Sequence, residues 1–177
     1  TGDKPLSETV KDYIRDKYHK PGNVFLGVVH RLDRPVAGLV VFARTSKALS
    51  RLNDMFRKGE VHKTYWAVTR NKPVEEKGTL VNWIVRNEKQ NKSYVYDKEV
   101  PGAKRAELKY QLIAHTDNYH LLEIELLTGR HHQIRCQLAH MGCVIKGDLK
   151  YGAPRSNTDG SISLLSHEVT LIHPVSK

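Results

Sequence analysis

The chain has 177 residues, of which 39% are hydrophobic, and this length suits one well-buried domain but not two ordinary ones. Lys and Arg number 29 against 19 Asp and Glu, which gives a formal net charge of +10. This excess indicates a polyanionic partner, with RNA or DNA favoured over an anionic membrane, although charge alone does not exclude a merely basic soluble protein.

The two cysteines, Cys136 and Cys143, are too few for a disulfide framework, and they do not form a Cys-x-x-Cys pair of the kind that binds zinc. No apolar run approaches the roughly 18 residues of a membrane span, and no signal peptide is visible. We therefore expect a cytoplasmic protein with no membrane partner.

The first periodic segment, residues 7–19, predicts a helix. Val10, Ile14 and Tyr18 share one helical face with Tyr13, Ser7 is the expected N-cap, and Pro21-Gly22 follows as the stop signal.

Two short apolar runs, residues 24–29 and 38–43, predict buried strands on either side of a charged stretch. That stretch holds Asp33 between Arg31 and Arg34, so Asp33 is expected at the end of a strand or on the turn that joins the two. A carboxylate kept ionised and aimed by neighbouring positive charge suits a nucleophile or a proton acceptor. The alternative is a structural salt bridge between Asp33 and one flanking arginine.

Residues 46–57 predict an amphipathic helix, with Leu49, Leu52 and Phe56 facing inward and Lys58-Gly59 at its end. Its outward Lys and Arg side chains suit either contact with phosphate or a solvated surface.

The middle of the chain predicts strands. Residues 61–68 have strand composition, and the expected strands 78–85, 92–96, 106–115 and 119–127 form a meander separated by charged turns. Residues 89–96 mix basic and aromatic side chains, as in an RNA-facing ribbon or a solvated hairpin.

A second conspicuous stretch begins where the last of these strands ends. Gly129 allows a sharp strand-to-helix turn, and Ile134, Leu138 and Met141 give the following helix a buried face. Three histidines occur here, His131, His132 and His140, but their spacing matches no zinc site and no Cys or acidic ligand joins them. We predict no metal site.

Four separated motifs resemble the RluA-type family of pseudouridine synthases, in the family's own order and from about residue 24 to residue 174. The first is His30-Arg31-Leu32-Asp33, which departs from the family only later, at Pro35-Val36-Ala37. The others are Lys63-Thr64-Tyr65, the run Thr128-Gly129-Arg130-His131-His132-Gln133-Ile134-Arg135, and Gly147-Asp148-Leu149-Lys150-Tyr151-Gly152, which shapes the wall of the site. A closing strand at 162–174 is also similar, with Leu165-Ser166 in place of His-Ala.

The resemblance implies an α/β (α+β) fold, with a mixed, mainly antiparallel central sheet flanked by a few helices, in one catalytic domain over residues 1–177. The family's domain normally opens with a strand ending in Asn-Lys-Pro, so we expect this domain to be N-terminally incomplete, with one sheet edge exposed or differently covered.

The resemblance also implies the roles of the site residues. Asp33 is the nucleophile, Tyr65 stacks on the base and helps to remove a proton, and Arg135 pairs with Asp33. The remaining expected substrate-binding residues are basic or line the site: Arg31, Arg34, Arg130, which holds the turn or meets phosphate, His132, which makes structural hydrogen bonds, and Leu164, the apolar wall.

The expected function is conversion of specific uridines to pseudouridine in structured RNA, either rRNA or tRNA, by a monomer that uses no cofactor and no metal. Two alternatives remain. The chain could be a non-catalytic RNA-binding module or RNA chaperone, or it could be a carboxylate-based glycosidase or nucleoside hydrolase. The last requires a second catalytic acid, and no paired acidic motif lies near Asp33.

Overall fold

The structure, a computed structural model, describes residues 2–176. They form two compact units. The smaller consists of residues 2–31, 40–60 and 172–176, and the larger of residues 32–39 and 61–171. No helix of residues 2–176 has the length and apolar content needed to cross a membrane. The expectation of a single domain stays a prediction.

The smaller unit contains α1 (Leu6–Lys17), β1 (Gly27–Val28), β3 (Phe42–Ala43) and α2 (Ser46–Lys58). The predicted N-cap of α1 is wrong, because the helix begins at Leu6 and its cap is Pro5, whose carbonyl accepts from the backbone of residues 8 and 9. The C-terminal end of α2 is as predicted, at Lys58-Gly59. Thr45 Oγ1 accepts from the backbone N–H of Ala48 at 3.1 Å, and Gly59 ends the helix with φ 74°.

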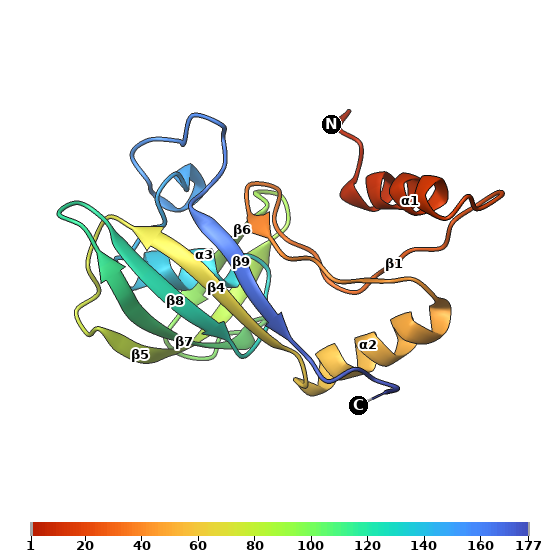
Figure 1. The fold of residues 1–177 in the computed structure, drawn as a ribbon. Coiled ribbons are helices and arrows are strands. Elements are labelled where there is room, and N and C mark those ends of the chain that lie inside the picture. The colour runs from red at the N-terminus through yellow and green to blue at the C-terminus, as the bar shows by residue number, and fades with distance from the viewer. Residues whose placement is uncertain (1, 177) are drawn as a thin grey trace. The chain divides into compact units, whose positions relative to one another are not determined.

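The larger unit is built on a sheet in the order β2-β9-β4-β8-β7-β5-β6, in which only the β2–β9 pair is parallel among the described strands (Figure 1). Its strands are β2 (Ala37–Gly38), β4 (His62–Thr69), β5 (Lys77–Asn87), β6 (Lys92–Tyr96), β7 (Lys104–His115), β8 (His120–Leu126) and β9 (Leu164–Thr170). The mixed, mainly antiparallel sheet is confirmed, and so are the four strands predicted over residues 78–127. The predicted meander is wrong in one respect, because β7 pairs with β5 and leaves β6 at the edge of the sheet.

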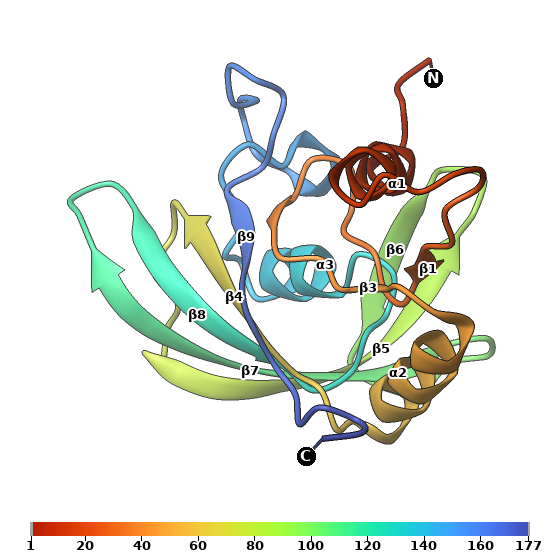
Figure 2. The same cartoon turned by 45° about the vertical axis from the view of Figure 1, so that its right-hand side comes forward.

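The sheet curves around α3 (Gln133–His140), which lies on its concave face (Figure 2). Alternate residues of a strand point to opposite faces, so one face of β4, β7 and β8 supplies the core. Leu108, Leu122 and Ile124 are fully buried there against Ile134 and Leu138 of α3. The predicted inward face of this helix is confirmed.

The strands predicted around Asp33 are shorter than expected. Only residues 27–28 and 42–43 pair with each other, while residues 37–38 turn away to pair with Leu165 and Ser166 of β9. The apolar run 38–43 is therefore shared between the two compact units and cannot continue as one strand. Gly38 makes the change of direction, with φ 120°.

We expect Gly38→Ala to destabilise the protein far more than Gly142→Ala. Both glycines have positive φ, which costs roughly 1–2 kcal/mol for alanine. A Cβ at Gly38 would also lie 2.3 Å from the carbonyl oxygen of Ser166, whereas a Cβ at Gly142 meets nothing within 4 Å. Urea unfolding should show an additional loss of roughly 2 kcal/mol for Gly38→Ala. Equal losses for the two variants would contradict the β2–β9 pairing.

Candidate active site

Asp33 lies on a tight turn that the core holds at both ends. The turn is closed by a hydrogen bond from the Val36 N–H to the Asp33 carbonyl at 2.9 Å, and Leu32 and Val36 pack against the core. The Pro35 carbonyl accepts from the Ile162 N–H at 2.9 Å, which fixes the turn to the segment before β9. The side chain of Asp33 remains 30% exposed, so the carboxylate is held in place and yet open to a ligand.

Arg135, in the first turn of α3, joins Asp33 to a second carboxylate. Its Nη1 donates to Asp33 Oδ2 at 3.1 Å, while Nε and Nη2 donate to the two oxygens of Asp148 at 2.7 and 2.8 Å. Burial acts to lower the pKa of this guanidinium, but the hydrogen bonds and charges of Asp148 and Asp33 outweigh burial and raise the pKa. Asp33 thus takes an ion pair from Arg135, which lies about one hundred residues away in the sequence.

Asp148 is the site residue whose role the sequence interpretation missed. Its side chain is 1% exposed, and a carboxylate is tolerated at that depth only with a charged, well-aligned partner. The bidentate pair with Arg135 supplies that partner and fixes the plane of the guanidinium. The sequence signal was a lone acid after the apolar pair Val144-Ile145, within a motif assigned only to the wall of the site.

His132 lies between Asp33 and Tyr151. Tyr151, in the 3₁₀ turn η1 (Leu149–Tyr151), accepts the Ser93 N–H at 2.9 Å and lies 2.9 Å from His132 Nδ1. Since the Tyr151 oxygen already accepts a proton, we assign its O–H as donor to Nδ1. The proton of the neutral imidazole is then on Nε2, 3.7 Å from Asp33 Oδ2.

Burial is the largest cause that lowers the pKa of His132, to about 4. The charge of Asp33 acts in the opposite direction, and Arg135 adds to the decrease. The imidazole is therefore neutral at pH 7. His132 also has φ 53°, so it is the left-handed residue of this strand-to-helix turn, whereas Gly129 has no positive φ.

Tyr65, on β4, is buried on the face of the sheet that carries α3, with 7% of its surface exposed. The pairing of β4 with β9 shifts register between Thr64 and Tyr65, which places Tyr65 opposite Ser166. Such bulges re-aim side chains next to functional sites. Burial raises the pKa of the Tyr65 phenol, an effect that the Ser166 side chain reduces and the charge of Asp33 increases.

The other predicted site residues are more scattered. Arg31 and Arg34 are exposed, and Arg31 belongs to the smaller unit. Arg130 donates from Nε to the Arg105 carbonyl at 2.9 Å, a contact that suits the predicted role of holding its turn. The alternative, contact of Arg130 with phosphate, stays a prediction. Leu164 is 5% exposed and forms part of the core, so its contact with a base stays a prediction.

The histidines do not gather as metal ligands. His131 stacks on His132 with ring centroids 3.7 Å apart, and His140 bonds to Asp97. Over residues 2–176, no group of three or more His, Cys, Asp or Glu side chains is placed to hold a metal ion.

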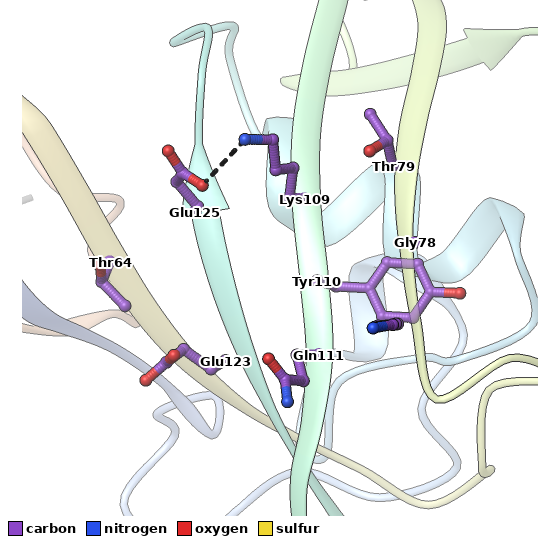
Figure 3. A pocket seen from close by; sticks show the side chains of 9 residues that line it. Thr64, Gly78, Thr79, Lys109, Tyr110, Gln111, Glu123 and Glu125 are labelled. Atoms are coloured by element: carbon purple, nitrogen blue, oxygen red, sulfur yellow. Dashed lines mark hydrogen bonds and ion pairs between the residues drawn. The ribbon is translucent and has the colours of Figure 1, made fainter.

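A hollow of about 430 Å³ lies over the sheet (Figure 3). Thr64 lines it, and Thr64 and Tyr65 point to opposite faces because neighbouring residues of a strand alternate. Glu123, Glu125 and Lys109 line it, and Lys109 Nζ bonds to Glu125 at 3.3 Å. Lys77 also lines the hollow, so two carboxylates face two lysines, of which Lys109 is already paired. The lining therefore has no excess of positive charge to attract a polyanion. The Asp33–Arg135–Asp148 arrangement is therefore the better candidate for chemistry on RNA.

Comparison with known proteins gives a consistent result. A family model described as RNA pseudouridylate synthase matches residues 3–140. The ribosomal large subunit pseudouridine synthase C of Rickettsia bellii is 35% identical over 137 residues, which cover 77% of this chain and 45% of that protein. The tRNA pseudouridine synthase C of Vibrio parahaemolyticus is 31% identical, over 97% of this chain and 75% of its own length.

The fold has a solved counterpart. The structure titled Human RNA Pseudouridylate Synthase Domain Containing 4 matches with a TM-score of 0.82 at 23% identity, over 97% of this chain and 76% of that one. The chain spans about half the length of several curated relatives, the Rickettsia protein included.

We expect the stability of the protein to depend on His132 between pH 7.5 and pH 5. The unfolded histidine, with a pKa near 6.5, binds a proton that the folded one, with a pKa of about 4, does not. The free energy of unfolding therefore falls as the pH drops through 6.5, and by pH 5 this one group contributes roughly 2 kcal/mol to the loss.

The variant to compare is His132→Asn, because asparagine tolerates positive φ and does not titrate. Urea unfolding at pH 7.5 and pH 5 should give a smaller loss for His132→Asn than for the wild type. The control, His62→Asn, replaces an exposed histidine. An unchanged loss in His132→Asn would show that the imidazole is not buried as a neutral group.

Proposed function

This chain belongs to the RNA pseudouridylate synthase family, and we propose that it converts specific uridines of structured RNA to pseudouridine. The observation that carries the proposal is the guanidinium of Arg135, which bonds to Asp33 and to the buried Asp148 together. A structural ion pair needs only one carboxylate. The second, partly exposed carboxylate is held by Arg135 at a place that a ligand can reach.

The reaction exchanges one bond of uridine for another. The bond between the sugar C1′ and N1 of uracil breaks, the base turns, and C1′ bonds to C5, which then releases its proton while N1 gains one. In our proposal Asp33 attacks the nucleotide, at the sugar or at the ring, and leaves again when the new bond has formed. Arg135 orients the carboxylate and remains positively charged throughout.

Tyr65 provides the surface against which the extruded base stacks. Because burial raises the pKa of its phenol, Tyr65 is protonated at neutral pH and can take the C5 proton only after it has given up its own. Leu164 forms the apolar wall on the same face of the sheet. His132, neutral and fixed by Tyr151, turns its Nε2 N–H towards Asp33 at 3.7 Å and adds no second positive charge beside the one that Arg135 supplies.

In our proposal the positive charge of the protein attracts RNA to the site. A net charge of +10 favours a polyanion, and Arg31, Arg34 and Arg130 are exposed cations in our proposed substrate-binding set. The names of the relatives include both a ribosomal and a tRNA enzyme, and we propose rRNA or tRNA as the substrate. The proposal includes a cytoplasmic monomer that uses neither cofactor nor metal.

We expect the wild-type protein to create one or a few new pseudouridines in RNA from a strain that lacks it, and Asp33→Ala to create none. Carbodiimide mapping after incubation measures the sites, and the protein used is the gene product that contains this sequence. Asp16→Ala, which removes an exposed carboxylate of α1, is the matched control and should behave as wild type. If neither the wild type nor Asp33→Ala forms pseudouridine while both bind RNA equally, the chain is an RNA-binding module and the catalytic assignment is wrong.

A further inference from the structure

A cavity of about 590 Å³ opens at the end of β4, apart from the residues of the candidate active site. Its volume lies within the range of small-molecule sites. It is lined by the residues that follow β4, the turn between β7 and β8, and the chain on both sides of η1: Arg70, Asn71, Tyr119, Val144, Ile145, Lys146, Gly147, Gly152, Ala153, Pro154, Arg155, Ser156 and Asn157.

The lining carries positive charge and no acid. Arg70, Lys146 and Arg155 contribute cations, and none of these lining residues is Asp or Glu. Over residues 2–176, the side chains of Arg70 and Arg155 form no hydrogen bond or ion pair with another residue. Two unpaired guanidinium groups beside one cavity favour an anionic ligand, and phosphate suits their planar, bidentate geometry.

The third cation is fixed in place. Lys146 Nζ donates to Asn157 Oδ1 at 2.8 Å and lies 5.9 Å from the ring centroid of Tyr119. The ring of Tyr119 is 39% exposed beside these cations. A cation group with an adjacent exposed aromatic ring is the combination that binds a nucleotide, with phosphate on the charges and the base on the ring.

The wall of the cavity is ordered by internal bonds. Asn157 Nδ2 donates to Ser163 Oγ at 3.2 Å, and the Ser163 N–H donates to the Lys146 carbonyl at 2.9 Å. A Cβ at Gly147 would lie 2.9 Å from the Asn157 side chain, so this close packing requires glycine. The loop between η1 and β9, which rises beyond the end of the sheet in Figure 1, is therefore pinned where it borders the cavity.

The cavity and the active site share one segment of chain. Gly147 and Gly152 border the cavity, while Asp148 and Tyr151 between them contact Arg135 and His132. Arg70 lies five positions after Tyr65 along extended backbone, which is roughly 16 Å. A nucleotide bound here is accordingly a different one from a base that stacks on Tyr65.

We propose that this cavity binds a second nucleotide of the substrate RNA, with its phosphate on Arg70 and Arg155 and its base on Tyr119. This inference rests on the proposed function for the identity of the RNA as substrate. Occupation of the cavity fixes the strand at a set distance from Asp33, so it contributes to which uridine enters the site.

The test measures binding of a uridine-free RNA oligonucleotide, which cannot undergo the reaction, by fluorescence anisotropy over a range of salt concentrations. We expect Arg70→Gln/Arg155→Gln to raise the Kd on the order of 10-fold and to reduce the salt dependence by about one to two phosphate contacts. The control, Arg15→Gln/Arg86→Gln, removes the same net charge from two arginines that pair with surface acids, and it should change the Kd less than about 3-fold.

Two further variants test whether a base stacks on Tyr119. Tyr119→Ala should weaken binding about 5-fold or more, and Tyr119→Phe, which keeps the ring, should bind as the wild type does. Thermal melting verifies that each variant is folded. Equal weakening of binding by the two double variants would overturn the proposal. Weaker binding in Arg70→Gln/Arg155→Gln with normal binding in Tyr119→Ala would also overturn it, because the cavity would then hold a phosphate without a stacked base.

The binding measurement does not depend on catalysis, so the nucleotide site and the proposed function can fail separately. If the wild type forms no pseudouridine and the cavity variants still lose affinity as described, the proposed function fails while the nucleotide site stands. If the wild type forms pseudouridine and the cavity variants bind the oligonucleotide normally, the proposed function stands and the nucleotide site fails.

Discussion

One guanidinium group holds together the parts of the chain that matter most for chemistry. Arg135 is buried at the start of α3 and donates to Asp148 on one side and to Asp33 on the other. The two carboxylates differ in exposure, 1% against 30%, so Asp148 anchors the arginine and Asp33 is the one that a ligand can reach. The turn that carries Asp33, the helix and the segment 147–152 must all be in place for this arrangement to exist.

Much of the fold follows from local pattern. The strands over residues 78–127 and the buried face of α3 were predictable, because alternation and helical spacing are properties of each segment alone, but the order of β5, β6 and β7 in the sheet was not. The strands next to Asp33 were not. Residues 38–43 have strand composition, but Gly38 pairs with β9 while Phe42 and Ala43 pair with β1 in the other unit. Pairing partners so far away in the sequence leave no trace in the composition of the run.

The site was predictable to a similar extent. A resemblance to a known family identified Asp33, Tyr65 and Arg135, and the structure brings Asp33 and Arg135 within 3.1 Å. Neither the anchor at Asp148 nor the left-handed conformation of His132 could be inferred from residue type. The first depends on how deeply one acid is buried, and the second on where a turn needs positive φ. Both are consequences of packing between distant segments.

The most direct test of this account is the single-turnover rate of pseudouridine formation by Arg135→Lys at saturating protein. Lysine keeps the positive charge but is a single point donor that cannot serve both carboxylates in the geometry of the guanidinium. We predict a rate about 100-fold or more below that of the wild type, with an RNA affinity that changes less than about 3-fold. A rate within a few fold of the wild type would show that charge alone suffices and that the double contact of Arg135 does not position Asp33.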